Sequence, residues 1–269
     1  MIKGELIGKG MTAEVYSWGN DKVLKLYFEQ FSGDWISREA KIGSLVHDAG
    51  VPSPKVFDII DMEGRKGLIF RRIFGKSLFK HVEAEPWMLY QYAKETAGFH
   101  YKIHKYSVDG LPSQKEIFIN KINRSSKILG SRLQKIYGYL QSLEDGTSIC
   151  HGDLHFGNII VSNNKLVAID WNGAYIGNPL GDVARTCMIM NSPAMPDGAP
   201  DIIVTPAQYI KWLTYWTYAN EYMRLSKARF EDIDAWKLPV AAAKLKDKIH
   251  GEEKWLMNII DESLEKLNA

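Results

Sequence analysis

Three oxygen-bearing side chains stand among short apolar runs in the second half of the sequence: Asp153, Asn158 and Asp170. A carboxylate and an amide oxygen are hard ligands of the kind that Mg²⁺ takes from a protein, with the rest of its shell left to phosphates and water. Another carboxylate near the metal, but not bound to it, can accept a hydroxyl proton or orient the hydroxyl for in-line attack. We therefore expect Asn158 and Asp170 to bind magnesium and Asp153 to act as the catalytic base.

The spacing of these residues predicts a β-hairpin. Apolar residues 159–161 and 166–169 flank the pair Asn163-Asn164, a typical tight turn. Such a hairpin would return Asp170 to the neighbourhood of Asn158. A polar turn in an ordinary hairpin is the alternative for each residue alone, but their joint spacing argues against it.

The segment His151-Gly152-Asp153, with Asn158 five residues after the aspartate and Asp170 a dozen further on, resembles the aminoglycoside phosphotransferase family. That family has a protein-kinase-like fold and includes choline, homoserine, methylthioribose and fructosamine kinases. The resemblance implies that Asp153 is the catalytic base, that Asn158 and Asp170 bind magnesium, and that His151 supports the site. It spans roughly residues 5–185 and is strongest over 149–184.

The same resemblance extends to residues 177–184, where the family aspartate that matches Asp182 braces the catalytic loop. A kinase-like site also needs a lysine for the α- and β-phosphates and a glutamate that pairs with it. Lys25 lies in a predicted strand between two leucines, and Glu39 lies in the helix predicted to follow. Glu29 is the competing partner, although it precedes the helix. Two surface charges are the alternative interpretation.

The loop that begins with Gly8 and Gly10 is expected to cover the phosphates, although a lone G-x-G is a weak signal. No G-x-x-x-x-G-K-[ST] motif is present, which excludes a P-loop enzyme.

Adenine is expected against the backbone of residues 69–73, so Phe70 and Arg71 are nucleotide-site candidates. A solvated surface position is the alternative for Arg71. We expect ATP or GTP as the phosphoryl donor.

The acceptor pocket is expected in the C-terminal half. Tyr215, Tyr218 and Tyr222 fall at helical spacings of three and four and form one stripe, for which core packing is the alternative. His155 would line the pocket or pack against the catalytic loop, and Trp171 is a further candidate. Residues 206–269 contain ten acidic and ten basic residues, which gives no support for a polycationic acceptor.

Two other groups of residues have side chains that could form a site. His100 and His104 stand at helical spacing, but the sequence shows no third ligand, so a metal site there is not expected. Cys150 stands beside the catalytic segment, and its apolar neighbour favours a buried packing residue over a thiol nucleophile.

The periodicity predicts an α+β, protein-kinase-like bilobal fold. The first lobe, residues 1–73, contains five antiparallel strands and one helix over 32–47, and the second, residues 74–269, is mainly helical.

The net charge is only +2, which gives no sign of a nucleic-acid partner, and no apolar run of about 20 residues predicts a membrane span. With two cysteines and no signal-peptide pattern, we expect a cytoplasmic protein. A monomer and a homodimer are both open for its oligomeric state.

A small hydroxyl compound is the expected acceptor. Gly152 occupies the place where many regulated protein kinases carry an arginine, no Ala-Pro-Glu follows, and the stretch from Asp170 to Asp182 is too short for an activation loop. A catalytically silent nucleotide-binding module and, less favoured, a protein kinase remain the alternatives.

Overall fold

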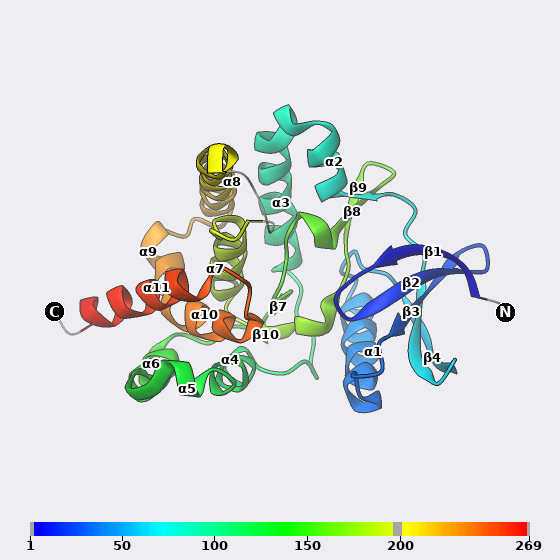
Figure 1. Cartoon of the computed structure of the whole chain (residues 1–269), viewed down its shortest axis with the longest axis horizontal. Coiled ribbons are helices and arrows are strands. Elements are labelled where there is room, and N and C mark those ends of the chain that lie inside the picture. Colours follow the sequence, from blue (N-terminus) through cyan, green and yellow to red (C-terminus); the bar gives the residue numbers. More distant parts are fainter. Residues whose placement is uncertain (1–2, 196–200, 268–269) are drawn as a thin grey trace.

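A computed structural model describes residues 3–195 and 201–267. The N-terminal part is one five-stranded sheet in which each neighbouring pair is antiparallel, in the order β1-β2-β3-β5-β4. Figure 1 shows this sheet and α1 at one end of the molecule, with the mainly helical part at the other. The five predicted strands and single helix are confirmed as β1 (Lys3–Lys9), β2 (Ala13–Trp18), β3 (Lys22–Tyr27), α1 (Gly33–Asp48), β4 (Val56–Met62) and β5 (Arg65–Arg71).

Helix α1 begins where its sequence can cap it. The Ser32 side chain accepts a hydrogen bond from the Trp35 backbone N–H, which satisfies one of the unpaired amides of the first turn. The buried face of the helix contains Ile36, Ile42 and Val46, and Glu39 lies on the same face at 4% exposure. A buried carboxylate among aliphatic side chains needs a cationic partner. The register of α1 therefore turns Glu39 toward the sheet.

The second part of the chain differs in detail from its prediction. The apolar periodicity of residues 85–106 predicts one long helix, but the structure begins this segment with a 3₁₀ turn. Helices α2 (Leu78–Ala84) and α7 (Pro179–Met190) lie where the sequence pattern predicts no helix. The sequence also predicts a loop rich in Pro, Gly and Asp over 191–201, and this segment lies partly outside the described residues. The helical elements are α2 (Leu78–Ala84), η1 (Pro86–Met88), α3 (Leu89–Ile103), α4 (Gln114–Asn123), α5 (Ser126–Leu129), η2 (Gly130–Arg132), α6 (Leu133–Ser142), α7 (Pro179–Met190), α8 (Asp201–Ser226), α9 (Phe230–Asp234), α10 (Lys237–Lys244), η5 (Leu245–Asp247) and α11 (Glu253–Lys266).

Two small sheets position the chemistry-bearing segment between the two parts. The predicted hairpin is confirmed as β8 (Ile159–Ser162) and β9 (Lys165–Ala168), joined by Asn163 and Asn164. Both asparagines have positive φ, 49° and 58°, as a two-residue turn of this kind requires. Strand β6 (Lys76–Ser77) adds to β8 where the chain enters the helical part. β7 (Ser148–Cys150) pairs with β10 (Tyr175–Gly177).

The largest apolar core lies in the helical part, around α3, α7, α8, α10 and α11. A second core extends from α1 and α3 to the β8–β9 hairpin, so the catalytic segment rests on buried side chains from both parts of the chain. Among the described residues, no helix is both long enough and apolar enough to cross a bilayer.

Candidate active site

The loop that follows β7 is fastened by Asp182 of α7. Its two carboxylate oxygens accept hydrogen bonds from the backbone N–H of His151 at 2.5 Å and of Gly152 at 2.8 Å. Gly152 has a φ of 76°, and a Cβ there would lie 2.3 Å from the carbonyl oxygen of Gly173. Only glycine fits such a position. This is the bracing arrangement that the family resemblance implies for Asp182.

Asp182 also meets two histidines of the α3 C-terminal turn. The Nε2 atoms of His100 and His104 lie 3.0 and 3.3 Å from Oδ2 of Asp182, and their Nδ1 atoms lie 2.6 and 2.7 Å from the hydroxyls of Tyr218 and Tyr222. Asp182 is therefore the third potential metal ligand beside His100 and His104, which the sequence did not reveal. These three side chains could hold a metal ion. Protons on both Nε2 atoms, with the tyrosines donating to Nδ1, satisfy all four contacts without one. Burial first, and then His100, lowers the pKa of His104 to about 4, which keeps it neutral at pH 7.

The carboxylate of Asp153 is held by a buried arginine. Nη2 of Arg185 in α7 donates to Oδ1 of Asp153 at 2.8 Å and to Oδ2 of Asp247 at 3.2 Å. His155 Nε2 lies 3.9 Å from Oδ2 of Asp153. Burial by itself would raise the pKa of Asp153, but Arg185, His155 and His151 outweigh it and hold that pKa below its usual value. Asp153 is therefore ionised at neutral pH, the state in which it can accept a proton.

The hairpin brings the two expected metal ligands to one end of β8 and β9. The backbone N–H of Ile169 donates to the carbonyl oxygen of Asn158 at 2.9 Å, so Asp170 directly follows this contact. The side-chain Nδ2 of Asn158 donates to the carbonyl oxygen of Asp153 at 3.0 Å, which leaves its Oδ1 without a partner in the part of the chain that is described. Asp170 has a φ of 65° and a partly exposed carboxylate. This set of hard oxygens fits a magnesium ion.

Lys25 reaches this end of the hairpin from the sheet. Its Nζ lies 2.7 Å from Oε1 of Glu39 and 2.9 Å from Oδ1 of Asp170. Burial alone would lower the pKa of Lys25, but the carboxylates of Asp170 and Glu39 outweigh it and hold the pKa above its usual value. The ammonium is therefore charged and linked to both parts of the chain. Glu39, rather than Glu29, forms the ion pair.

The other nucleotide-site candidates lie along the sheet. Gly8 pairs with Val15 near the end of β1, and Gly10 begins the turn into β2, where its N–H donates to the carbonyl oxygen of Ala13. Phe70 packs against the core beside α1. Arg71 has the solvated surface position that was one of its two interpretations, because its side chain pairs with the exposed Asp21. Its backbone N–H donates to the carbonyl oxygen of Lys55. This backbone N–H therefore cannot also donate a hydrogen bond to adenine.

Three of the expected acceptor-pocket residues are buried in the core instead. Trp171 is 4% exposed and donates from Nε1 to the carbonyl of Ala168, while Tyr218 and Tyr222 hold the two histidines described above. The helical stripe predicted for these tyrosines is therefore a packing face. Of the remaining candidates, His155 lies beside Asp153, as stated.

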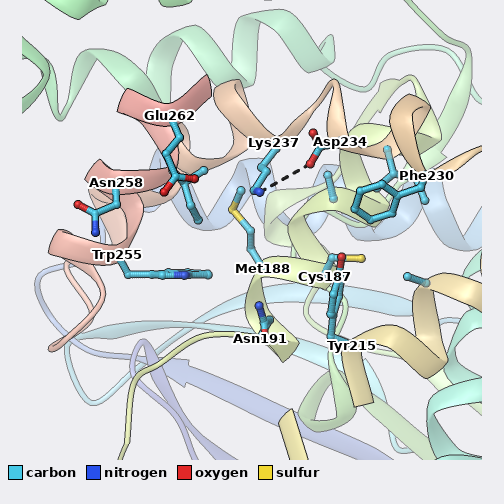
Figure 2. A pocket seen from close by; sticks show the side chains of 14 residues that line it. Cys187, Met188, Asn191, Tyr215, Phe230, Asp234, Lys237, Trp255, Asn258 and Glu262 are labelled. Carbon is cyan, nitrogen blue, oxygen red and sulfur yellow. Dashed lines mark ion pairs between the residues drawn. The ribbon is translucent and has the colours of Figure 1, made fainter. Parts of the chain in front are cut away.

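Tyr215 lines a cavity of about 300 Å³ between α7, α8, α9 and α11 (Figure 2). Figure 2 shows Tyr215, Phe230 and Trp255 among its walls, with Asp234 and Lys237 forming an ion pair. Neither Arg185 nor Asp153 is among the residues that line this cavity. The cavity is therefore separate from the Asp153 carboxylate.

Sequence reasoning missed the cationic groups around Asp153. Arg185, Lys121 and Lys246 come from α7, α4 and η5, three segments that only the tertiary fold brings together. One signal could have revealed Arg185, since it interrupts the apolar run Val183-Ala184 and Cys187-Met188 within a short buried helix. A charged residue in such a run needs a specific partner.

Comparison with solved structures identifies the fold of this chain, and comparison with a family model then identifies its family. Solved structures of low identity share the fold: a thermostable mutant of aminoglycoside phosphotransferase APH(4)-Ia (16% identity, 96% of this chain and 92% of that one, TM-score 0.63), and the amicoumacin kinase hAmiN in complex with AMP-PNP, Ca²⁺ and Ami (14%, 98% and 88%, 0.60). A putative fructosamine-3-kinase from Haemophilus somnus 129PT is similar (14%, 96% and 90%, 0.60). The architecture is therefore the protein-kinase-like bilobal fold, as predicted.

The profile of the APH phosphotransferase enzyme family matches residues 3–202, which is most of the chain. The chain belongs to this family, and the predicted resemblance is confirmed. A search of curated proteins finds no significant match. The family and the related folds support a phosphotransferase that acts on small molecules.

Proposed function

We propose that this protein transfers the terminal phosphoryl group of ATP or GTP to a hydroxyl group of a small molecule, with magnesium bound at Asn158 and Asp170. The observation that carries the proposal is the convergence of an ionised Asp153, the oxygens of Asn158 and Asp170, and the charged Lys25 at one end of the β8–β9 hairpin. Each group has the chemical character that its proposed role needs.

In the proposed reaction, Lys25 binds the α- and β-phosphates and is held in place by Glu39. Asp153 accepts the proton of the acceptor hydroxyl through Oδ2, because Oδ1 is occupied by Arg185. The hydroxyl oxygen then forms a bond to the terminal phosphorus, and the bond from that phosphorus to the leaving diphosphate breaks. Magnesium would neutralise charge on the phosphate oxygens.

The segment after Asp170 supports a small acceptor. It forms a 3₁₀ turn, η4 (Trp171–Gly173), and then β10, which pairs with β7. No long loop between Asp170 and α7 is available to dock a peptide, and Gly152 leaves no side chain to bind a phosphorylated loop. We infer that activity does not depend on phosphorylation of the protein, so phosphatase treatment should leave the rate unchanged.

We also propose that the protein works in the cytoplasm. The thiols of Cys150 and Cys187 are both buried and unpaired, and burial raises the pKa of each well above its usual value. Inert free thiols of this kind suit the reducing cytoplasm that we expect. We propose that residues 71–76 connect the two lobes, near the expected boundary at residue 73.

The test is magnesium-dependent ATP and GTP turnover with a panel of hydroxyl compounds. Asp153→Asn keeps the size of the side chain but removes the base, and should lower acceptor-stimulated turnover roughly 10²- to 10⁴-fold. The matched control is Asp145→Asn, at an exposed carboxylate outside the site. Nucleotide binding without turnover on any acceptor would instead identify a silent module, and phosphorylation of peptides alone would identify a protein kinase.

A further inference from the structure

The surroundings of Asp153 in the helical lobe carry an excess of positive charge. Two carboxylates, Asp153 and Asp247, lie among three cationic side chains, Arg185, Lys246 and Lys121. The excess is one positive charge when all five groups are ionised. A buried charge is costly without a partner. The chemistry of the group that balances this excess charge therefore indicates what binds beside Asp153.

Arg185 is 7% exposed and yet incompletely paired. A single nitrogen, Nη2, serves both Asp153 and Asp247, in place of the two-nitrogen fork that arginine usually offers a carboxylate. Its Nε is buried and has no hydrogen-bond partner among the described residues. The guanidinium therefore retains donor capacity beside the proposed base.

Lys121 of α4 is half-buried and forms no ion pair or hydrogen bond within residues 3–195 and 201–267. Burial first, then the charges of Arg185 and Lys246, lowers its pKa to about 7, while Asp247 and Asp153 oppose the shift. Two other lysines of the helical lobe differ from Lys121 in having a carboxylate partner. Lys244 is fully buried and pairs with Glu252, and Lys115, on the same helix as Lys121, pairs with Asp145.

We propose that the acceptor carries an acidic group, a carboxylate or phosphate, close to its reactive hydroxyl, and that Lys121 and Arg185 bind this group beside Asp153. This inference rests on the proposed function and names its acceptor class. An acidic group would supply the carboxylate that Lys121 lacks and would satisfy the free donor of Arg185. A polycationic acceptor would instead meet an excess of like charge.

The transferring phosphoryl group is a second source of negative charge near Asp153. The expected nucleotide ligands, Lys25 and Asp170, approach from the sheet and from the β8–β9 hairpin. Lys121, Arg185 and Lys246 belong to α4, α7 and η5 of the helical lobe, and α4 packs directly against η5. The cationic group therefore faces Asp153 from the acceptor's lobe.

The experiment measures kcat and KM for hydroxy acids, each matched with its neutral amide or alcohol and with an amino alcohol, and includes kanamycin as a polycation. The wild-type protein should prefer the hydroxy acids. Lys121→Met, which keeps the length of the side chain, should raise KM for them roughly 10- to 100-fold, as expected for a lost hydrogen bond to a charged group. KM for ATP should not change. Lys127→Met, at an exposed lysine of α5, is the matched control.

The outcomes separate the two proposals. Turnover that favours neutral or cationic acceptors, or that Lys121→Met leaves unaltered, would overturn the acidic acceptor and leave phosphoryl transfer standing. A higher KM for ATP, or slower acceptor-independent ATP hydrolysis in Lys121→Met, would assign the charge to the phosphoryl group and also overturn it. Failure of every acceptor, with no effect of Asp153→Asn on ATP hydrolysis, would overturn the proposed function itself.

Discussion

Nη2 of Arg185 lies 2.8 Å from Oδ1 of Asp153, so the carboxylate proposed as the base has one of its two oxygens fixed by a buried guanidinium. The same nitrogen reaches Asp247 at 3.2 Å. This contact orients Asp153 and favours its ionised form, and it leaves Oδ2 for the acceptor hydroxyl. Arg185 is thereby a positioning residue as well as part of the proposed acidic-group site.

We predict that Arg185→Met lowers kcat roughly 10- to 100-fold, because a base that is free to rotate spends less time in the reactive geometry. The variant should also change the pH profile. Without the guanidinium, the largest of the effects that oppose burial is lost, so the pKa of Asp153 rises and the acid limb of kcat/KM moves to higher pH. Kinetics between pH 5 and pH 8 provide the measurement.

Arg224→Met, at an exposed arginine of α8 that pairs with Glu221, is the control and should match the wild-type protein. A lower kcat with an unmoved acid limb would show that Arg185 acts through structure alone. Such a result would contradict the electrostatic role assigned to it.

Lys25 and Glu39 allow activity and stability to be separated. Lys25→Met should lower kcat/KM for ATP roughly 10²- to 10³-fold, as for the loss of one fixed charge at a reacting phosphate. It should also cost about 3 kcal/mol of unfolding free energy, because Glu39 stays buried without a counter-ion. Adding Glu39→Gln should restore most of the stability and none of the activity. Urea unfolding and steady-state kinetics give the two readouts, with Lys41→Met, exposed on α1, as control.

Local patterns predicted much of this site. Ser32 at the start of α1, Asn163-Asn164 in the hairpin and the spacing from Asp153 to Asp170 are each encoded within a few residues, so the strands, the helix and the site segment could be inferred from the sequence. The C-terminal tyrosine stripe could not be interpreted in the same way. A helical stripe looks identical whether it faces a ligand or a core, and only packing against His100 and His104 shows that Tyr218 and Tyr222 face inward.

The cationic groups around Asp153 were hidden for a different reason. Any two of Lys121, Arg185 and Lys246 are more than 60 residues apart in the sequence, and each lies in an ordinary helical segment. No short-range rule joins them. Only the packing of α4, α7 and η5 assembles the group, and a charge count over residues 206–269 includes only Lys246 of the three.

The buried histidines predict a loss of stability in mild acid. His104 has a native pKa of about 4 against an ordinary value of 6.5, so between these values the unfolded chain binds more protons than the native protein. Its contribution to stability is present above pH 6.5 and is lost as the pH falls toward 4, by about 3 kcal/mol in all. His104→Gln keeps a donor for Asp182 without titrating, and should flatten this part of the curve.

The measurement is the urea midpoint from pH 7 to pH 4, for the wild-type protein and the variant. His47→Gln, at a histidine in the last turn of α1, is the control and should retain the wild-type slope. A slope that does not change in His104→Gln would mean that other groups cause the loss of stability in acid.

Gly152 and Gly138 form a matched pair for the backbone of the catalytic loop. Gly152 has a φ of 76° and no room for a Cβ, whereas Gly138 is exposed inside α6, with nothing within 4 Å of the Cβ position. Gly152→Ala should therefore cost at least about 2 kcal/mol, from left-handed strain and displacement of Gly173, and should reduce activity by moving Asp153. Gly138→Ala should stabilise the protein by about 0.4–1 kcal/mol, because alanine has fewer unfolded conformations to lose. Chemical unfolding of both variants measures the difference, and a Gly152→Ala protein as stable and as active as the wild type would contradict the requirement for glycine beside the base.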